Sequence, residues 1–378
     1  MSKFKSAAGD DKSGAAAAQL IHARIRNWAG SLLRLLAGTY CGGLALFLGL
    51  RLLTDGSWWF LALLNTFALY LFLPLLLVVP LCGLLRMRRL GWAAAALSVI
   101  GLAWFGGGAV RAMPAAPEHV PLPQSGSALK IVVYNVRDGG RNIAPDVAWL
   151  LGTDADVIFL SELNDVGVDV RLDALRRAYP YEVRGDVNQR ILSRHALRAD
   201  ESVVMDASPW RGVAIKTGIE LAGRQLSLYS VHTAIPRGTK DHFDMGRFPF
   251  NFLPQRNFLI SLVARYDETQ RNWEVEQLLS VVRADSNPVI VAGDFNTSPY
   301  STMYARVAAL LQDTQAEAGS GLGHTWPNGA VVGAPQWLPA LLRIDYIWHS
   351  AEFVALSHQV AGPLGSDHLP VMAVLAWK

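Results

Sequence analysis

The chain has 378 residues, 51% of them hydrophobic, and a formal net charge of +3. Its length allows two or three domains, or one large domain with an appendage. The charge is unevenly divided, because residues 128–378 hold 23 Lys and Arg against 27 Asp and Glu, a balance of −4. A mildly acidic region is a poor electrostatic partner for a nucleic-acid backbone, which argues against dedicated nucleic-acid binding.

An apolar region follows a short basic arm at residues 1–30. Both cysteines of the chain, Cys41 and Cys82, lie in this region, so residues 128–378 contain no disulfide and no catalytic thiol. A membrane span needs about 20 apolar residues. The apolar region, residues 31–110, therefore predicts three transmembrane helices, near 32–53, 58–83 and 90–110.

Basic residues predict the orientation of these helices. The arm at residues 1–30 is rich in Lys and Arg, and Arg86, Arg88 and Arg89 lie between the second and third predicted spans. Basic loops stay in the cytoplasm. We therefore expect a multi-pass protein of the plasma (inner) membrane, with a cytoplasmic N-terminus. Residues 111–127, which contain four prolines, then form a linker to an extracytoplasmic domain at 128–378.

From residue 128 onward, short apolar runs typical of buried strands are separated by helical segments. Strands are predicted at 129–134, 156–160, 213–216, 225–231, 289–292, 343–348 and 369–375, and helices at 146–151, 172–178 and 257–279. The fold class indicated is α/β.

Polar residues recur where the predicted strands begin or end. A single Asn or Asp at such a place is usually a turn residue. Turns do not require carboxylates and histidines together, so the repetition indicates a functional site at one end of the strands. The residues are Asn135, Glu162, His232, Asp294 with Asn296, Asp345, and Asp367 with His368.

These side chains suit phosphoryl chemistry. Glu162 is a hard oxygen ligand for Mg²⁺ or Mn²⁺, and no Cys/His spacing typical of zinc is present. Asp294 can orient or deprotonate a water molecule, and Asn135 and Asn296 can donate hydrogen bonds to phosphate oxygens.

Next to Asp345, His368 would be an imidazole oriented by a carboxylate. Together with a metal, it can stabilise the charge of a phosphoryl transition state. Either Asp294 or His368 can serve as the general base, and the sequence leaves this choice open.

The ordered set of motifs resembles the endonuclease/exonuclease/phosphatase superfamily, also called the DNase-I-like fold. The resemblance covers residues 129–378 and implies a two-sheet α/β sandwich with its site at one end. The motifs are Ile131-Val-Val-Tyr-Asn135, Val157-Ile-Phe-Leu-Ser-Glu162, Ile191-Leu-Ser-Arg194, Ser230-Val-His232-Thr-Ala-Ile-Pro236, Gly293-Asp-Phe-Asn296, Arg343-Ile-Asp345-Tyr and Ser366-Asp-His368.

The resemblance also implies roles for individual residues. Glu162 corresponds to the metal ligand, and Asp367 to a second acid near the metal. His232 is similar to a histidine that contacts phosphate or donates a proton. Asn135 and Arg194 fall in the motifs expected to bind substrate.

One position departs from part of the superfamily. Abasic-site nucleases carry an acid two residues after the asparagine, where this chain has Arg137. The predicted membrane anchor instead resembles the branch that includes VanJ-type glycopeptide resistance proteins.

We therefore expect a membrane-anchored, divalent-metal-dependent phosphoesterase that acts outside the cytoplasm on a phosphorylated lipid, a lipid-linked headgroup or a small phosphoester. The aromatic insert Arg237–Arg256 and the segment Trp326–Leu342 would then meet lipid, unless they are ordinary packed loops. The alternatives are an extracytoplasmic metal-dependent nuclease and a non-catalytic membrane-bound binding module.

Overall fold

A computed structural model describes most of the chain as two compact units. One comprises residues 10–54 and 68–105, and the other comprises residues 58–67 and 128–378 wherever they are described. The described residues are 10–54, 58–105, 128–137, 143–163, 169–185, 188–198, 201–204, 213–238, 263–329 and 338–378. Most of the aromatic insert Arg237–Arg256 lies outside them.

The first unit is helical, with α1 (Asp10–Thr54), α3 (Ala68–Phe72), α4 (Leu75–Leu84) and α5 (Arg88–Phe105). Among the described residues, Asn27–Thr54 is the one helical stretch long and apolar enough to cross a membrane. Such a stretch near an N-terminus fits an anchor or a signal sequence. The 18 residues of α5 begin with two arginines that lower its mean hydropathy, so the expected three-helix anchor is not confirmed.

The second predicted span is not a single helix. It is divided into α2 (Trp59–Thr66), α3 and α4, and the chain bends by 78° between α2 and the segment that follows it. α4 begins directly after Pro74, whose ring nitrogen cannot donate the hydrogen bond of a continuing helix. The two parts can form one span only as a bent pair, and α2 belongs to the second compact unit.

The rest of the second unit is a two-sheet α/β sandwich, as the sequence predicts. The strand orders are β11-β12-β1-β2-β4-β3 and β5-β6-β7-β8-β10-β9. The strands are β1 (Ala128–Asn135), β2 (Val157–Ser161), β3 (Tyr181–Arg184), β4 (Arg190–Ser193), β5 (Glu201–Val204), β6 (Val213–Leu221), β7 (Arg224–His232), β8 (Val289–Asp294), β9 (Gln312–Asp313), β10 (Asp345–His349), β11 (Phe353–Val360) and β12 (Val371–Trp377).

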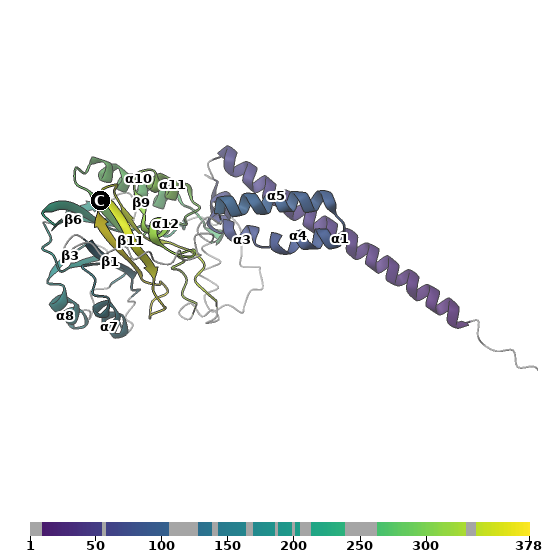
Figure 1. The fold of residues 1–378 in the computed structure, drawn as a ribbon, viewed down its shortest axis with the longest axis horizontal. Coiled ribbons are helices and arrows are strands. Elements are labelled where there is room, and N and C mark those ends of the chain that lie inside the picture. Colours follow the sequence, from purple (N-terminus) through teal and green to yellow (C-terminus); the bar gives the residue numbers. More distant parts are fainter. Residues whose placement is uncertain are drawn as a thin grey trace, which may run out of the picture. The chain divides into compact units, whose positions relative to one another are not determined.

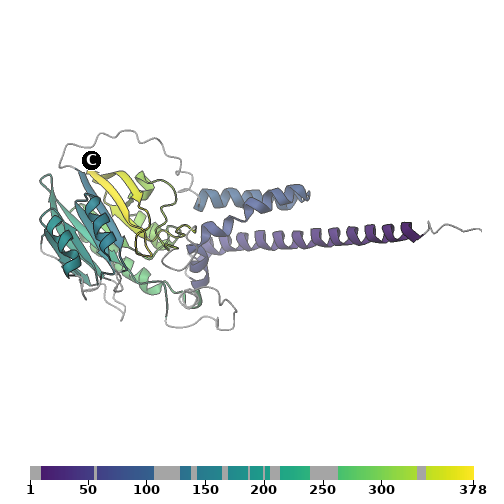
Figure 2. The ribbon, with the colours of Figure 1, turned by 90° about the horizontal axis from the view of Figure 1, so that it is seen from below.

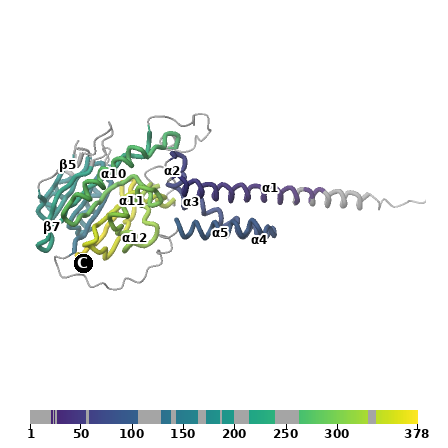
Figure 3. The backbone as a smooth tube through the Cα atoms, turned by 90° about the horizontal axis from the view of Figure 1, so that it is seen from above, coloured from purple at the N-terminus to yellow at the C-terminus, as the bar shows by residue number. Residues whose placement is uncertain are grey.

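Helices cover the outer faces of both sheets (Figure 1). The first sheet packs against α7 (Ala144–Gly152) and α8 (Asp169–Ala178), which lie together over its strands in Figure 2. The second sheet packs against α10 (Thr269–Ala284) and α11 (Thr302–Ala308), and Figure 3 shows α10 running along this side. The short helix α12 (Thr314–Ala318) follows β9.

Strand alternation decides which residues face the core between the sheets. Successive side chains of a strand point to opposite faces. In β8, Ile290 and Ala292 join the core between the sheets, whereas Val289 and Val291 pack under α10 and α11. Asp294 continues the alternation of Ile290 and Ala292, so it lies at the end of the inner face.

Candidate catalytic and metal site

Strand register brings three predicted site residues into one row of the second sheet. β7 and β8 are parallel, with His232 opposite Asp294. β10 runs antiparallel to β8, with Asp345 on the other side of Asp294. In the first sheet, Asn135 pairs with Ser161, so Glu162 follows at the same end. Both sheets therefore contribute polar side chains to one end of the sandwich.

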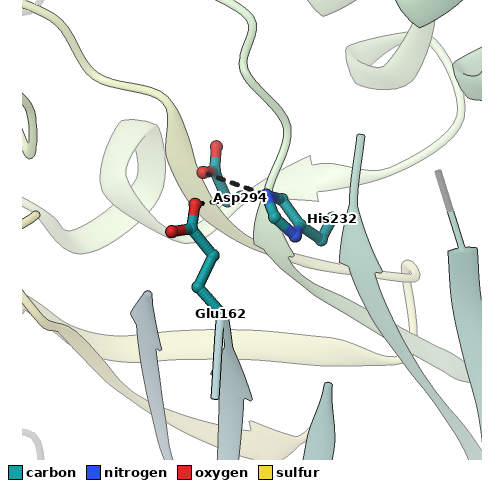
Figure 4. Close-up of side chains that lie close together, drawn as sticks. All are labelled: Glu162, His232 and Asp294. Carbon is teal, nitrogen blue, oxygen red and sulfur yellow. Dashed lines mark ion pairs between the residues drawn. The ribbon is translucent and has the colours of Figure 1, made fainter. Parts of the chain in front are cut away.

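Glu162, His232 and Asp294 point toward one another at this end (Figure 4). Nε2 of His232 lies 3.7 Å from Oε1 of Glu162 and 3.9 Å from Oδ2 of Asp294. The amide Nδ2 of Asn135 donates hydrogen bonds to both carboxylates, of 2.9 Å to Glu162 and 3.1 Å to Asp294. The side chain of Glu162 is 40% exposed, so this group is open to solvent.

The donor chemistry of this group fits a divalent cation. Within the described part of the chain, two sets of acidic and histidine side chains have ligand atoms within 4.8 Å of one another: Glu162 with His232 and Asp294, and Asp294 with Asp345 and His368. The first set holds two carboxylates and one imidazole, and carboxylate oxygens are the ligands that hard cations prefer.

The second set already contains a cation of its own. Nδ1 of His368 lies 2.9 Å from Oδ2 of Asp345, and Nε2 lies 3.7 Å from Oδ2 of Asp294. Burial lowers the pKa of His368, but Asp345 and Asp294 outweigh this and raise it to about 10. The imidazole is therefore protonated at neutral pH, and the first set is the better candidate for a metal.

Asp294 lies at the centre of both sets. Burial, followed by the negative charge of Asp345, raises its pKa to about 6, although His368 and His232 act in the opposite direction. At neutral pH this carboxylate is mostly ionised, but it is a stronger base than the carboxylate of an ordinary aspartate. A carboxylate of this kind is suited to accept a proton from water.

The loop after β8 is held in an unusual conformation. Asn296 has φ +46°, in the left-handed region, and its backbone N–H donates to Oδ1 of Asp294 at 2.9 Å. Its side-chain Nδ2 donates to the carbonyl of Thr233 at 2.8 Å. Arg137 (φ +40°) and Glu162 (φ +54°) are left-handed as well, so three chain turns at this end depend on such residues.

Two buried charged residues of α10 support these loops, and sequence reasoning missed both. Arg271, 1% exposed, donates through Nη1 to the carbonyl of Asn296 at 2.5 Å. Glu274, also 1% exposed, accepts the backbone N–H of Ala234 at 2.7 Å in the loop after β7. In a sequence, charged residues three positions apart on a helix look like a solvated face, so no pattern marks them.

Asp367, the second predicted metal ligand, lies outside both candidate metal sets. Its carboxylate accepts a hydrogen bond from Nε1 of Trp326 at 3.3 Å and lies 3.7 Å from Nε of Arg137. The neighbouring hydroxyl of Ser366 donates to the carbonyl of Asn135 at 2.7 Å, which joins this loop to the site. A metal-ligating role for Asp367 stays a prediction.

The structure separates Arg194 from the site. Arg194 follows β4, whose Ser193 pairs with Val157 at the beginning of β2, whereas Glu162 follows the opposite end of β2. Its guanidinium pairs with the carboxylate of Asp154 at 2.5 Å. The position of Arg194 therefore does not support the substrate-binding role expected from its motif.

Two six-stranded sheets with a carboxylate, amide and imidazole cluster at the ends of their strands define a sandwich of the DNase-I-like type. A model of the endonuclease/exonuclease/phosphatase family matches residues 132–368, and the chain belongs to this family. A search of curated proteins finds no match. The narrower resemblance to VanJ-type proteins stays a prediction.

Solved structures of low sequence identity are similar to the sandwich. A family protein from Bacteroides thetaiotaomicron is 15% identical with a TM-score of 0.49, and the match covers 66% of this chain and 98% of that one. A family protein from Leptotrichia buccalis is 17% identical with a TM-score of 0.48, covering 66% and 100%. TDP2 from C. elegans is 15% identical with a TM-score of 0.49, covering 66% and 75%.

Proposed function

We propose that this protein is a membrane-anchored, divalent-metal-dependent phosphoesterase that acts on a phosphorylated lipid or lipid-linked headgroup. The observation that carries the proposal is the pair of side-chain sets that share Asp294, one open and acidic and the other carrying the buried His368 imidazolium. A phosphate ester needs both a cation and a proton acceptor near it, and this arrangement supplies both.

In this proposal Glu162, with His232 and Asp294 beside it, would hold Mg²⁺ or Mn²⁺. The bound metal would supply positive charge to phosphate oxygens and a lowered pKa to a water ligand. Asp294 accepts the proton of the attacking water, since it lies where the candidate metal set and the His368 set meet. His368 stays protonated and donates from Nε2, while Asp345 fixes its ring through Nδ1.

Two features favour a lipid substrate over a nucleic acid. Residues 128–378 carry a balance of −4, which opposes a long polyanion but accommodates a single phosphate. The apolar stretch Asn27–Thr54 has the length of a membrane span, and a tethered site meets substrates in the bilayer at a high effective concentration. The three-span anchor, with its second span then formed by Ala68–Leu84 without α2, and the outward-facing site remain part of this proposal.

A phosphate-release assay of the full chain in vesicles tests the proposal. The substrates are phosphatidic acid, a polyprenyl diphosphate, a nucleotide and duplex DNA, each with Mg²⁺ and with EDTA. We expect turnover on a lipid substrate that EDTA and Glu162→Gln both abolish. Equal rates on DNA and lipid would contradict the lipid phosphoesterase and favour a nuclease. Turnover in EDTA would contradict the requirement for a metal.

Fusion of a reporter after Lys378 tests the orientation. A periplasmic alkaline phosphatase reporter should be active there and a cytoplasmic fluorescent reporter should be dark. The reverse result would place the site in the cytoplasm and change the accessible pool of lipids.

A further inference from the structure

Helix α2 is apolar except at its C-terminal end. Its last two residues, Asn65 and Thr66, are 4% and 7% exposed. Buried polar groups are costly unless they form hydrogen bonds, so their partners indicate what the helix end does. Both partners belong to the same compact unit as the catalytic sandwich.

Asn65 contacts the catalytic loop directly. Its side-chain Nδ2 donates to the carbonyl of Tyr300. Tyr300 lies in the segment between β8 and α11, which runs from Phe295 through Asn296 to Ser301, the N-cap of α11. The end of α2 therefore holds the loop at Tyr300, and the same loop contributes Asn296 to the site.

Thr66 reaches the same loop by a second route, through buried side chains. Its hydroxyl lies 2.6 Å from the hydroxyl of Tyr266, which donates to Oε1 of Glu268 at 2.7 Å. The same carboxylate oxygen accepts from Nη2 of Arg271 at 2.6 Å. Nη1 of Arg271 then donates to the carbonyl of Asn296 at 2.5 Å.

The direction of these hydrogen bonds is fixed by chemistry. A guanidinium only donates and an ionised carboxylate only accepts. Burial, followed by the charge of Glu268, raises the pKa of Tyr266, so its hydroxyl keeps the proton that it donates to Glu268. Tyr266 then accepts from Thr66, whose hydroxyl proton is shared with the carbonyl of Ala62 at 3.1 Å. Hydrogen bonds from Tyr266 and Arg271 therefore converge on a single oxygen of Glu268, which joins the two halves of the path from α2 to Asn296.

We propose that α2 is a positioning element of the active site, and that Thr66, Tyr266, Glu268 and Arg271 form a relay that holds Asn296, and through it the carboxylate of Asp294, in the working geometry. The inference rests on the proposed function for its catalytic readout. In this inference α2, a helix of the apolar N-terminal region, influences the turnover rate of a site that is far from it in sequence.

The test uses the full chain in detergent micelles, with p-nitrophenyl phosphate and bis(p-nitrophenyl) phosphate as soluble probes. Thr66→Val removes the hydroxyl at nearly constant volume, and Thr66→Ser retains it. We expect Thr66→Val to lower kcat by roughly tenfold with KM unchanged, because small misplacements of catalytic groups slow turnover strongly. Thr66→Ser should restore kcat to within about twofold of the parent protein, since the relay is intact.

Hydrogen exchange provides a readout that does not need turnover. Asn296 N–H is bonded to Asp294 Oδ1, so a peptide covering residues 294–298 reports the loop directly. We expect exchange there to quicken in Thr66→Val and in Tyr266→Phe, and the double variant to quicken it no further than the worse single variant. The matched control is Thr217→Val, which removes a buried hydroxyl of β6 bonded to the carbonyl of Arg198.

The outcomes separate the two proposals. If no probe or lipid is hydrolysed but exchange at 294–298 quickens in Thr66→Val and not in Thr66→Ser or Thr217→Val, the relay stands and the phosphoesterase proposal fails. If turnover is present and Thr66→Val matches the parent protein in kcat and in exchange, the relay is overturned. An equal effect of Thr66→Val and Thr217→Val would overturn it too, because the effect would then be a general loss of packing.

Discussion

Gly293→Ala is expected to be among the most damaging single-methyl additions in the sandwich. Gly293 has φ +145°, and a Cβ at this position would lie 1.9 Å from the carbonyl oxygen of Val231 and 2.8 Å from its carbonyl carbon. Carbon and oxygen atoms normally approach no closer than about 3.3 Å. The obstacle is the backbone of β7, so no side chain can rotate away to make room.

The cost can be worked out from three contributions. Backbone strain at a position that L-residues rarely adopt costs about 1–3 kcal/mol. Forcing an extra carbon into a packed site costs about 1–3 kcal/mol. Parting β7 from β8 weakens the ladder where Val231 pairs with Gly293, at about 1 kcal/mol for each lost hydrogen bond. We expect a loss of about 3–7 kcal/mol from the free energy of unfolding, a large part of the ~5–15 kcal/mol of a typical domain.

Two glycines provide matched controls. Gly223 has φ +76° with no atom within 4 Å of an added Cβ, so Gly223→Ala isolates backbone strain at about 1–2 kcal/mol. Gly152 ends α7 with equally open space and no unusual φ, so Gly152→Ala should be neutral or stabilise by up to about 1 kcal/mol.

Pulse proteolysis of the full chain across a urea series gives the unfolding midpoint of each variant. Activity should be lost in Gly293→Ala even below the midpoint, since His232 and Asp294 form the next pair of the same ladder. A midpoint for Gly293→Ala equal to that of Gly223→Ala would refute the argument that the close approach to Val231 is the main cost.

Three further predictions concern single side chains. Glu162→Gln should weaken Mg²⁺ binding measured by calorimetry without lowering the urea midpoint. Unchanged binding would show that Glu162 is not a ligand of the metal. Combined loss of His368 and Asp345 should slow turnover no more than the worse single variant, because they share one task; independent, multiplying losses in kcat would refute the dyad. Burial lowers the pKa of His358 to about 4 from 6.5, and its Nε2 is buried with no partner among the described residues. Because the unfolded chain takes up the proton first, the stability present above pH 6.5 should fall by up to about 3 kcal/mol as pH drops to 4, and His358→Asn should flatten this slope in urea midpoints measured at pH 7.5 and 5.

Most central strands were predictable, whereas the edge strands and the short central strand β4 were not. Central strands such as β8 are buried on both faces, so each appears in the sequence as a continuous apolar run. The edge strand β3 has one buried residue in four, and β11 alternates through Ser357 and Gln359, so neither forms such a run. The polar site residues could be found in the sequence because they lie at strand ends, and both sheets bring these strand ends to the same end of the sandwich.

The support behind the site could not be predicted from the sequence. Arg271 and Glu274 fall in the predicted helix 257–279, but no pattern marks them as buried, because burial of a helix face depends on tertiary packing. The break after α2 was missed for a similar reason. Asn65 and Thr66 look like tolerable polar residues in a membrane span, and only the fold shows that they bond to Tyr300 and Tyr266.

The left-handed residues Arg137, Glu162 and Asn296 have a consequence for how the protein responds to heat. Each non-glycine residue in this region holds a conformation less favourable than the right-handed one by about 1–2 kcal/mol. The surrounding packing imposes these turns, and they relax as soon as that packing loosens. The end of the sandwich that carries the site should therefore open in sub-global fluctuations well before the sheets separate. Loss of activity on warming then precedes loss of the fold, and a variant with a stronger core alone would melt later without working at a higher temperature.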